Sequence, residues 1–347
     1  MVDYASIASH RVPAWEGLRR PFDKEITDAA EMGIESGLSN WNVRSEEAEH
    51  KGYTFSTPTF HTVADIGGET VILGTSGERR AKGNVQNEDM LEMGQALRAA
   101  ALDGVGKATW QTAGWLKGGK QVFGTLALEQ ETVLDPKGVA DRINKYIIVY
   151  SSHDGSLSLG GGRTAVRVRC TNTFQMALGG LESAFKFRHT ASIHDKMTQI
   201  VEVWRESAQW FASLDALAET MLATPFSEKQ YANYVEAFTG KAPEHNRKGA
   251  LTKWEGNREK YFATWKTDAN AGIRGSVWGA FNAATEREQW FRNIQEGRGD
   301  AGRENFFAAG AGFDGPTNKF RQVALDEALR RGGIKVPDVL AKVPALA

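Results

Sequence analysis

The sequence is almost without cysteine, since Cys170 is the only one among 347 residues. A single cysteine cannot form an internal disulfide, and it cannot supply a zinc site built from several thiolates. We therefore expect the protein to reside in a reducing compartment, the cytoplasm.

Long apolar runs are missing as well. Nowhere do about 18 consecutive apolar residues occur, the length that a membrane-spanning helix needs. The first residues, MVDYASIASHRVPAW, also lack the basic segment followed by an apolar stretch that marks a secretory leader. We expect neither secretion nor a membrane partner. A composition with 41% hydrophobic and 24% charged residues is instead typical of a globular chain.

An excess of charge of one sign is the third absence. The formal net charge of −1 gives the whole molecule no preference for nucleic acid, so a site for a polyanion requires local segregation of charge. Such segregation is present. One acidic segment covers residues 23–49, and basic side chains gather in two places, which hold Arg79, Arg80 and Lys82, and Arg163, Arg167, Arg169, Lys186 and Arg188.

The local patterns predict an α+β fold. A helix between Thr27 as N-cap and Gly37 precedes a hairpin of two strand-like runs, 59–66 and 69–74, joined by Gly67-Gly68. Asn87 can cap a helix with apolar residues at spacings of three and four. Four strands then follow in a pattern typical of an antiparallel meander: ATWQTAGW, QVFGTLAL, KYIIVYSS and TAVRVRC.

Helical periodicity returns after Cys170. Thr171 or Asn172 can cap a helix, and strand signals vanish beyond about residue 193. We predict an antiparallel sheet flanked by helices over residues 1–190 and a mostly helical C-terminal region over 191–347, which either forms a unit of its own or packs on the core. The segment 240–250 has the composition of a linker.

The strand TAVRVRC is the first candidate site. Side chains alternate along a strand, so Arg163, Arg167 and Arg169 share one face while Val166 and Cys170 lie on the other. One interpretation is a cationic stripe that binds phosphates, assisted by the N-terminus of the helix expected at Asn172. The other is a solvated strand face whose arginines pair with carboxylates.

The run AGWLKGGKQ is the second candidate site. It resembles a phosphate-binding P-loop, but Gln121 replaces the metal-binding Ser or Thr and a strand follows where a helix is required. It is better interpreted as a glycine hairpin whose Lys117 and Lys120 contact a nucleic-acid backbone. Trp115 beside them is a candidate for stacking on bases, although most tryptophans pack in cores.

The loop His153-Asp154-Gly155-Ser156 is the third candidate site. An imidazole and a carboxylate are the ingredients of acid–base chemistry, and His189 is a possible third member. An Asp before a Gly is also a standard turn dipeptide, which provides a structural interpretation. His189 and His194 lie five residues apart, a spacing that does not place two metal ligands on one helical face. We predict no metal site, no cofactor and no certain catalytic residue.

Several blocks together resemble a known family. They are WNV, GNVQNEDMLEMGQAL, TAGWLKGGKQVFGTLAL, YIIVYSSHDGSLSL, RTAVRVRCTNTFQMAL, FRHT and WGAFNAATEREQW. They are similar, from about residue 13 to about 330, to the phage/plasmid-like family of unknown function DUF932. The resemblance implies a setting in mobile elements of bacteria and brings no catalytic residues. The order of elements also resembles the core of phage single-strand annealing recombinases, which is an analogy of topology.

These observations give three hypotheses for function. The first is a single-stranded-DNA-binding and annealing protein of a phage or plasmid recombination system, homo-oligomeric as a ring or filament and acting without ATP. Its DNA contacts would be Arg79, Arg80, Trp115, Lys117, Lys120, Arg163, Arg167 and Arg169. The second is a nucleic-acid- or nucleotide-acting enzyme in which His153, Asp154 and His189 meet in a cleft. The third is an accessory protein that binds a host protein through an exposed apolar patch on its C-terminal helices.

Overall fold

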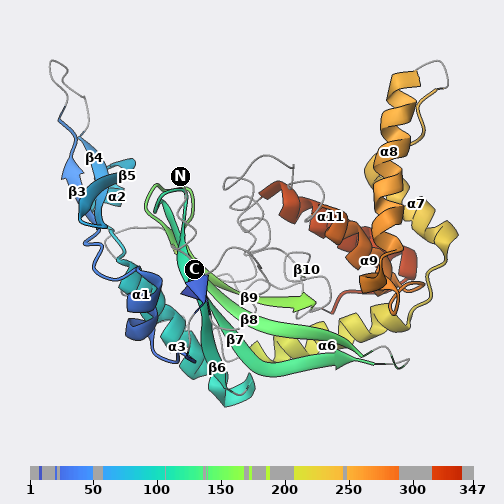
Figure 1. The fold of residues 1–347 in the computed structure, drawn as a ribbon, viewed down its shortest axis with the longest axis horizontal. Helices are drawn as coiled ribbons and strands as arrows, with labels where there is room; N and C mark the ends of the chain where they lie inside the picture. The colour runs from blue at the N-terminus through green and yellow to red at the C-terminus, as the bar shows by residue number, and fades with distance from the viewer. Residues whose placement is uncertain are drawn as a thin grey trace.

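The computed structural model has two sheets and a set of helices. It describes residues 8–9, 20–21, 24–49, 58–105, 107–135, 138, 140–167, 172–173, 185–187, 207–244, 248–288 and 315–337. Over these residues, no helix combines the length and the apolar character needed to cross a membrane. Figure 1 shows the larger sheet in the middle of the molecule, the smaller sheet on one side and most of the C-terminal helices on the other.

The smaller sheet contains the predicted hairpin. Strands β4 (Thr59–Ile66) and β5 (Glu69–Gly77) pair antiparallel, and β3 (Arg44–Glu47) pairs with the other edge of β4. Gly67 and Gly68 both have positive φ angles, which a two-residue hairpin turn of this kind requires. The hairpin prediction is therefore confirmed. A short helix, α2 (Glu78–Ala81), follows β5 directly.

The larger sheet is built on the predicted meander. Its four long strands are antiparallel neighbours in chain order: β6 (Ala108–Leu116), β7 (Gln121–Leu134), β8 (Asp141–Ser152) and β9 (Leu159–Arg167). Short strands extend its two edges: β1 (Ala8–Ser9) and β2 (Arg20–Pro21) beside β6, and β10 (Asn172–Thr173) and β11 (Phe185–Phe187) beside β9. The α+β class predicted from the pattern is confirmed.

Two helices precede the meander. In α1 (Ala29–Ser36), Asp28 rather than the expected Thr27 is the N-cap, because its carboxylate accepts the N–H of Glu31 at 2.9 Å. Gly37 ends this helix in the left-handed conformation. Helix α3 (Asn87–Val105) begins at Asn87, where the sequence places a helix start. It lies against the larger sheet, so closely that a side chain at Gly94 would overlap the ring of Trp110.

The structure corrects the expected helix start at Asn172. Asn172 does not begin a helix; with Thr173 it forms β10, which pairs antiparallel with Arg167 and Val166 of β9. Residues 174–184 lie outside the described residues, so a helix that starts after Thr173, and a phosphate site at its N-terminus, stay predictions. A strand forms at Asn172 and Thr173 because the edge of β9 has unpaired backbone groups that the returning chain can bind.

The C-terminal region is helical as predicted. Its described helices, including the single 3₁₀ turn η4, are α6 (Ser207–Ala223), α7 (Glu228–Thr239), α8 (Lys248–Trp265), η4 (Asp268–Asn270), α9 (Val277–Glu286) and α11 (Gly315–Gly332). The proposed linker 240–250 covers the connection between α7 and α8 and also the first three residues of α8, which begins at Lys248. The predicted boundary at residue 190 falls outside the described residues.

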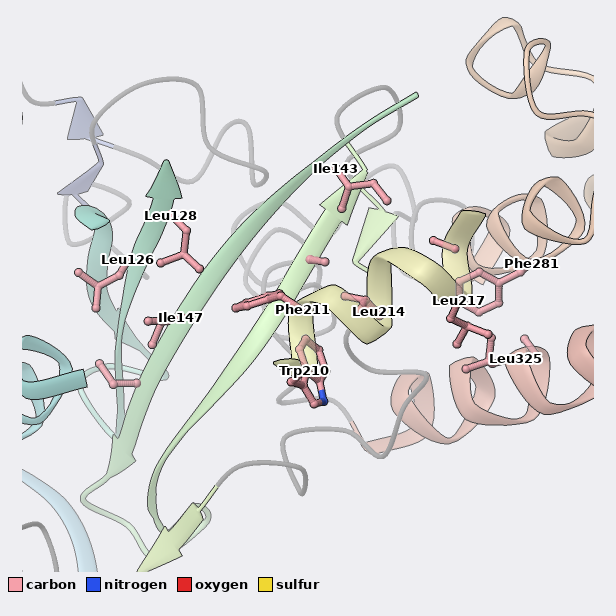
Figure 2. Packing of buried hydrophobic residues seen from close by; sticks show 14 of the residues in the cluster. Leu126, Leu128, Ile143, Ile147, Trp210, Phe211, Leu214, Leu217, Phe281 and Leu325 are labelled. Atoms are coloured by element: carbon pink, nitrogen blue, oxygen red, sulfur yellow. The ribbon is translucent and has the colours of Figure 1, made fainter. Parts of the chain in front are cut away.

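Helix α6 packs on the larger sheet and joins it to the other helices. Phe211 and Leu214 lie with Ile143 and Ile147 of β8 in one buried hydrophobic cluster, which continues through Leu217 to α9 and α11 (Figure 2). Each such side chain contributes about 1.5–3 kcal/mol when fully buried. A buried hydrogen bond at 2.9 Å, from Trp278 Nε1 to Asp141 Oδ2, also connects α9 to β8. The inner face of the sheet is therefore closed by helices from both halves of the chain.

Candidate nucleic-acid interface

The β6–β7 turn presents two lysines. Leu116 pairs with Gln121, and the turn between them has positive φ angles at Lys117, Gly118 and Gly119. Two glycines make this sharp reversal accessible, and strand β7 follows immediately. The interpretation as a hairpin rather than a P-loop is confirmed. Lys117 and Lys120 are both exposed.

The β8–β9 loop next to this turn is a hydrogen-bonded turn in its own right. Asp154 Oδ1 accepts the N–H of Ser156 at 2.8 Å, and Gly155 has a positive φ of 84°. The backbone N–H of His153 donates to the carbonyl of Lys120 at 2.7 Å, which fixes the loop to the β6–β7 turn. The turn interpretation of His153-Asp154-Gly155-Ser156 thus describes the local geometry.

The His153 ring is buried, with 2% of its surface exposed. Its Nε2 lies 2.9 Å from Oδ1 of Asn87, the first residue of α3. Burial, together with the positive charge of Arg80, lowers the pKa of His153 from 6.5 to about 4. At neutral pH the ring is uncharged and joins the sheet to α3, which is a structural role.

Helix α2 brings two arginines to the same place. Arg80 Nη2 donates to the carbonyl of Ser152 at 2.9 Å, and Arg79 beside it is exposed. Burial lowers the pKa of the half-buried Arg80, although Asp154 counteracts this effect. Gly74 of β5 allows the close approach, because a Cβ atom there would lie 2.7 Å from the Cα of Asp154.

The structure thus brings together four of the predicted cationic residues at one end of the larger sheet. Arg79 and Arg80 come from α2, and Lys117 and Lys120 from the β6–β7 turn. The loop 153–156 holds the two segments in place through its contacts with Arg80 and Lys120. We call Arg79, Arg80, Lys117 and Lys120 the turn-end cluster.

Trp115 is less accessible than a stacking residue requires. Its ring is partly buried and meets the ring of Trp41 edge-on, with 5.2 Å between centroids. Trp41 is in turn held by a hydrogen bond from its Nε1 to the carbonyl of Gly37. Trp115 therefore packs against Trp41 next to the β6–β7 turn. Trp110 on the same strand is fully buried.

The expectation that Arg163 lies on an exposed cationic face is wrong. Only 7% of Arg163 is exposed, and its guanidinium lies 5.7 Å from the ring centroid of Trp210 on α6. Register places it opposite Ile147, on the face that α6 covers. Arg167 pairs with Ile143 further along the same strand, whereas Arg169 and Cys170 lie outside the described residues.

Lys145 is a second buried cation on this face, and the sequence pattern did not predict it. Lys145 of β8 is 4% exposed, and its Nζ lies 2.7 Å from Oδ2 of Asp215 on α6. The available signal was alternation, because Lys145 stands two residues before Ile147 and four before Val149, both of which face the core. Local sequence could not predict its carboxylate partner, because Asp215 belongs to α6 in the other half of the chain.

No specific contact among the described residues supports either of the two alternative hypotheses. His189 lies outside the described residues, so the meeting of His153, Asp154 and His189 stays a prediction. Among the described residues, no cluster of three or more His, Cys, Asp or Glu side chains is arranged to hold a metal ion. The large exposed hydrophobic residues of the described chain are scattered over four elements: Ile34, Ile72, Val133 and Val323.

Comparison with known proteins places the chain in a family. No curated protein and no solved structure gave a significant match. One family model, described as "Domain of unknown function (DUF932)", matches residues 83–327, which is more than half of the chain. That span includes α3, the whole meander and the helices from α6 to α9. The protein belongs to the DUF932 family.

Proposed function

We propose that the protein binds single-stranded DNA through the turn-end cluster and pairs complementary strands as a homo-oligomer. The observation that carries the proposal is the convergence of Arg79, Arg80, Lys117 and Lys120 from two segments far apart in the sequence. Arginine and lysine contacts to phosphates provide most of the affinity in binding without sequence preference.

The charge balance of this region supports an anionic ligand. Lys82 forms an ion pair with Glu78 at 2.6 Å, and Asp154 is engaged with the N–H of Ser156. The four cations of the cluster outnumber these two nearby carboxylates. Because the net charge of the chain is close to zero, one cluster binds weakly, and repetition of the cluster around an oligomer would raise the affinity.

The order of the elements supports the choice of single strands. Helix α3 followed by the β6–β9 meander resembles the core of phage single-strand annealing recombinases, an analogy of topology alone. Asn172 itself lies in β10, and a helix after it would fall outside the described residues, so the likeness does not include one. The setting that we propose is the cytoplasm of a bacterial host, within a recombination system of a mobile element and without ATP.

The test is a titration of a fluorescent single-stranded oligonucleotide with purified protein at 50 and 200 mM salt, read by anisotropy. We expect affinity to fall as salt rises, with a slope of log K against log salt near −0.7 for each phosphate contact. Arg79→Ala/Lys117→Ala/Lys120→Ala should reduce that slope by about 2 and weaken binding at both salt concentrations.

The matched control removes three exposed lysines from α8, Lys248→Ala/Lys253→Ala/Lys260→Ala, which changes net charge equally. It should bind like the wild type. Absence of binding at 50 mM salt, or equal losses in both triple variants, would contradict the proposal. A strand-pairing assay on the same proteins then separates annealing from binding alone.

A further inference from the structure

A second candidate site lies toward the opposite end of β6 from the turn-end cluster. A cavity of about 280 Å³ opens there between β6, β7 and β8, with Glu25 and Lys107 at its margin. It is somewhat smaller than the pockets that bind drug-sized molecules, which start at roughly 300 Å³. The cavity does not touch Arg79, Arg80, Lys117 or Lys120, so a ligand in it would bind whether or not the turn-end cluster binds DNA.

Two adjacent irregularities in the sheet create this cavity. In β6, Trp110 pairs with Leu126 and Thr112 with Thr125, which leaves Gln111 as an extra residue. In β7, Ala127 pairs with Tyr146 and Glu131 with Asn144, so three residues of β7 stand opposite Lys145 alone. β-Bulges re-aim side chains and occur often beside functional sites.

The bulged residue Gln111 lines the cavity in an unusual state. It is only 5% exposed, and its Oε1 has no hydrogen-bond partner in the part of the chain that the structure describes. Leaving a buried amide oxygen unpaired costs free energy, and an apolar residue of similar size would avoid that cost. A ligand with an N–H donor would satisfy this oxygen.

The charged groups around the cavity indicate the sign of the ligand. Both lysines are already neutralised, Lys107 by Glu25 at 2.6 Å and Lys145 by Asp215 at 2.7 Å. Glu129 at the same cavity is exposed and takes part in none of the ion pairs of the described residues. The cavity therefore offers a free carboxylate and a free amide oxygen, both of which are acceptors.

We propose that this cavity binds a small organic cation that carries a primary ammonium group. Gln111 Oε1 and the Glu129 carboxylate accept the N–H donors of that group, and the carboxylate balances its charge. The walls contributed by Ala127, Leu128 and Tyr146 suit a short aliphatic chain. A linear diamine has the required size and chemistry, whereas an anion meets only cations that are already paired.

The experiment is calorimetric titration of the full chain with 1,4-diaminobutane, with 1,4-butanediol as the uncharged molecule of the same length. We expect saturable binding of the diamine and none of the diol. Gln111→Leu and Glu129→Gln should each weaken diamine binding about tenfold or more, since each removes one acceptor of a charged donor. Glu236→Gln, an exposed glutamate on α7, is the matched control and should bind like the wild type.

Unfolding curves without ligand separate a ligand role from a structural one. Gln111→Leu should unfold at the same temperature as the wild type or higher, because it removes an unpaired buried oxygen. The proposal is overturned if the diamine does not bind, if the diol binds equally well, or if the Gln111 and Glu129 variants retain wild-type affinity.

Discussion

Two groups of cationic side chains in this protein have the same chemistry and opposite surroundings. The turn-end cluster, Arg79, Arg80, Lys117 and Lys120, lies on turns and a short helix with at least part of each side chain in solvent. Arg163 and Lys145 lie in the middle of strands and are buried under α6. A basic residue on a strand is therefore a surface feature only where no helix covers its face.

Burial changes what a cation does. Lys145 and Arg163 have lost most of their water, so a charge partner and aromatic rings must compensate: Asp215 and Phe211 for Lys145, and Trp210 for Arg163. Arg79, Lys117 and Lys120 are exposed and Arg80 is half-buried, so the cluster keeps much of its hydration. The buried pair should act on stability and the turn-end cluster on binding.

The largest expected effect is on the buried ion pair. Asp215→Ala leaves the ammonium of Lys145 buried without its counter-charge and should lower the free energy of unfolding by about 3 kcal/mol. Lys145→Met/Asp215→Leu removes both charges and should recover most of that loss. Urea unfolding of the two variants measures both free energies. Equal losses in both variants would show that lost packing, rather than the unpaired charge, causes the destabilisation.

The next effect is a pH dependence within the turn-end region. The folded-state pKa of His153, about 4, lies below the ordinary value of 6.5, so the unfolded chain binds the proton more readily. The stability that the neutral ring provides is complete above pH 6.5 and is lost as pH falls toward 4. The loss should reach about 3 kcal/mol.

Urea unfolding at pH 7, 5.5 and 4.5 measures this loss. The control is His153→Gln, whose amide does not titrate in this range and should flatten this part of the profile. If wild type and variant follow parallel curves, His153 does not carry the pH dependence.

The smallest effect tests the comparison directly with one arginine from each group. Arg163→Ala should lower the free energy of unfolding by about 2 kcal/mol, through lost packing on Trp210, and leave DNA affinity unchanged. Arg79→Ala should change stability by less than about 0.5 kcal/mol and weaken DNA binding. Thermal unfolding measures the stability of the two variants, and anisotropy measures their DNA affinity. The reverse pattern would show that the two groups of cations do not differ in this way.

Local patterns predicted much of the fold. The hairpin at Gly67-Gly68, the start of α3 at Asn87 and the four strands of the meander follow from turn residues, capping and periodicity, which act between neighbours in the chain. Asn172 does not start a helix but pairs with β9, because strand pairing depends on a partner that local sequence does not reveal.

The candidate site was only partly predictable. The lysines at 117 and 120 follow from a recognisable glycine turn, whereas their position beside Arg80 depends on the contact between Gly74 and the loop at 153–154. Gln111 gave no signal at all, because a bulge is a mismatch between two strands and exists only once they are paired.

Most elements of this protein, its family and the positions of its charges along the chain can be recognised from local sequence. The tertiary structure decided which charges face water. Helix α6 has the main effect, because its Trp210, Phe211 and Asp215 cover one face of β8 and β9. Lys145 and Arg163 on that face are therefore part of the core. The physical reason is that desolvation depends on every group that packs against a side chain, and these groups come from distant parts of the chain.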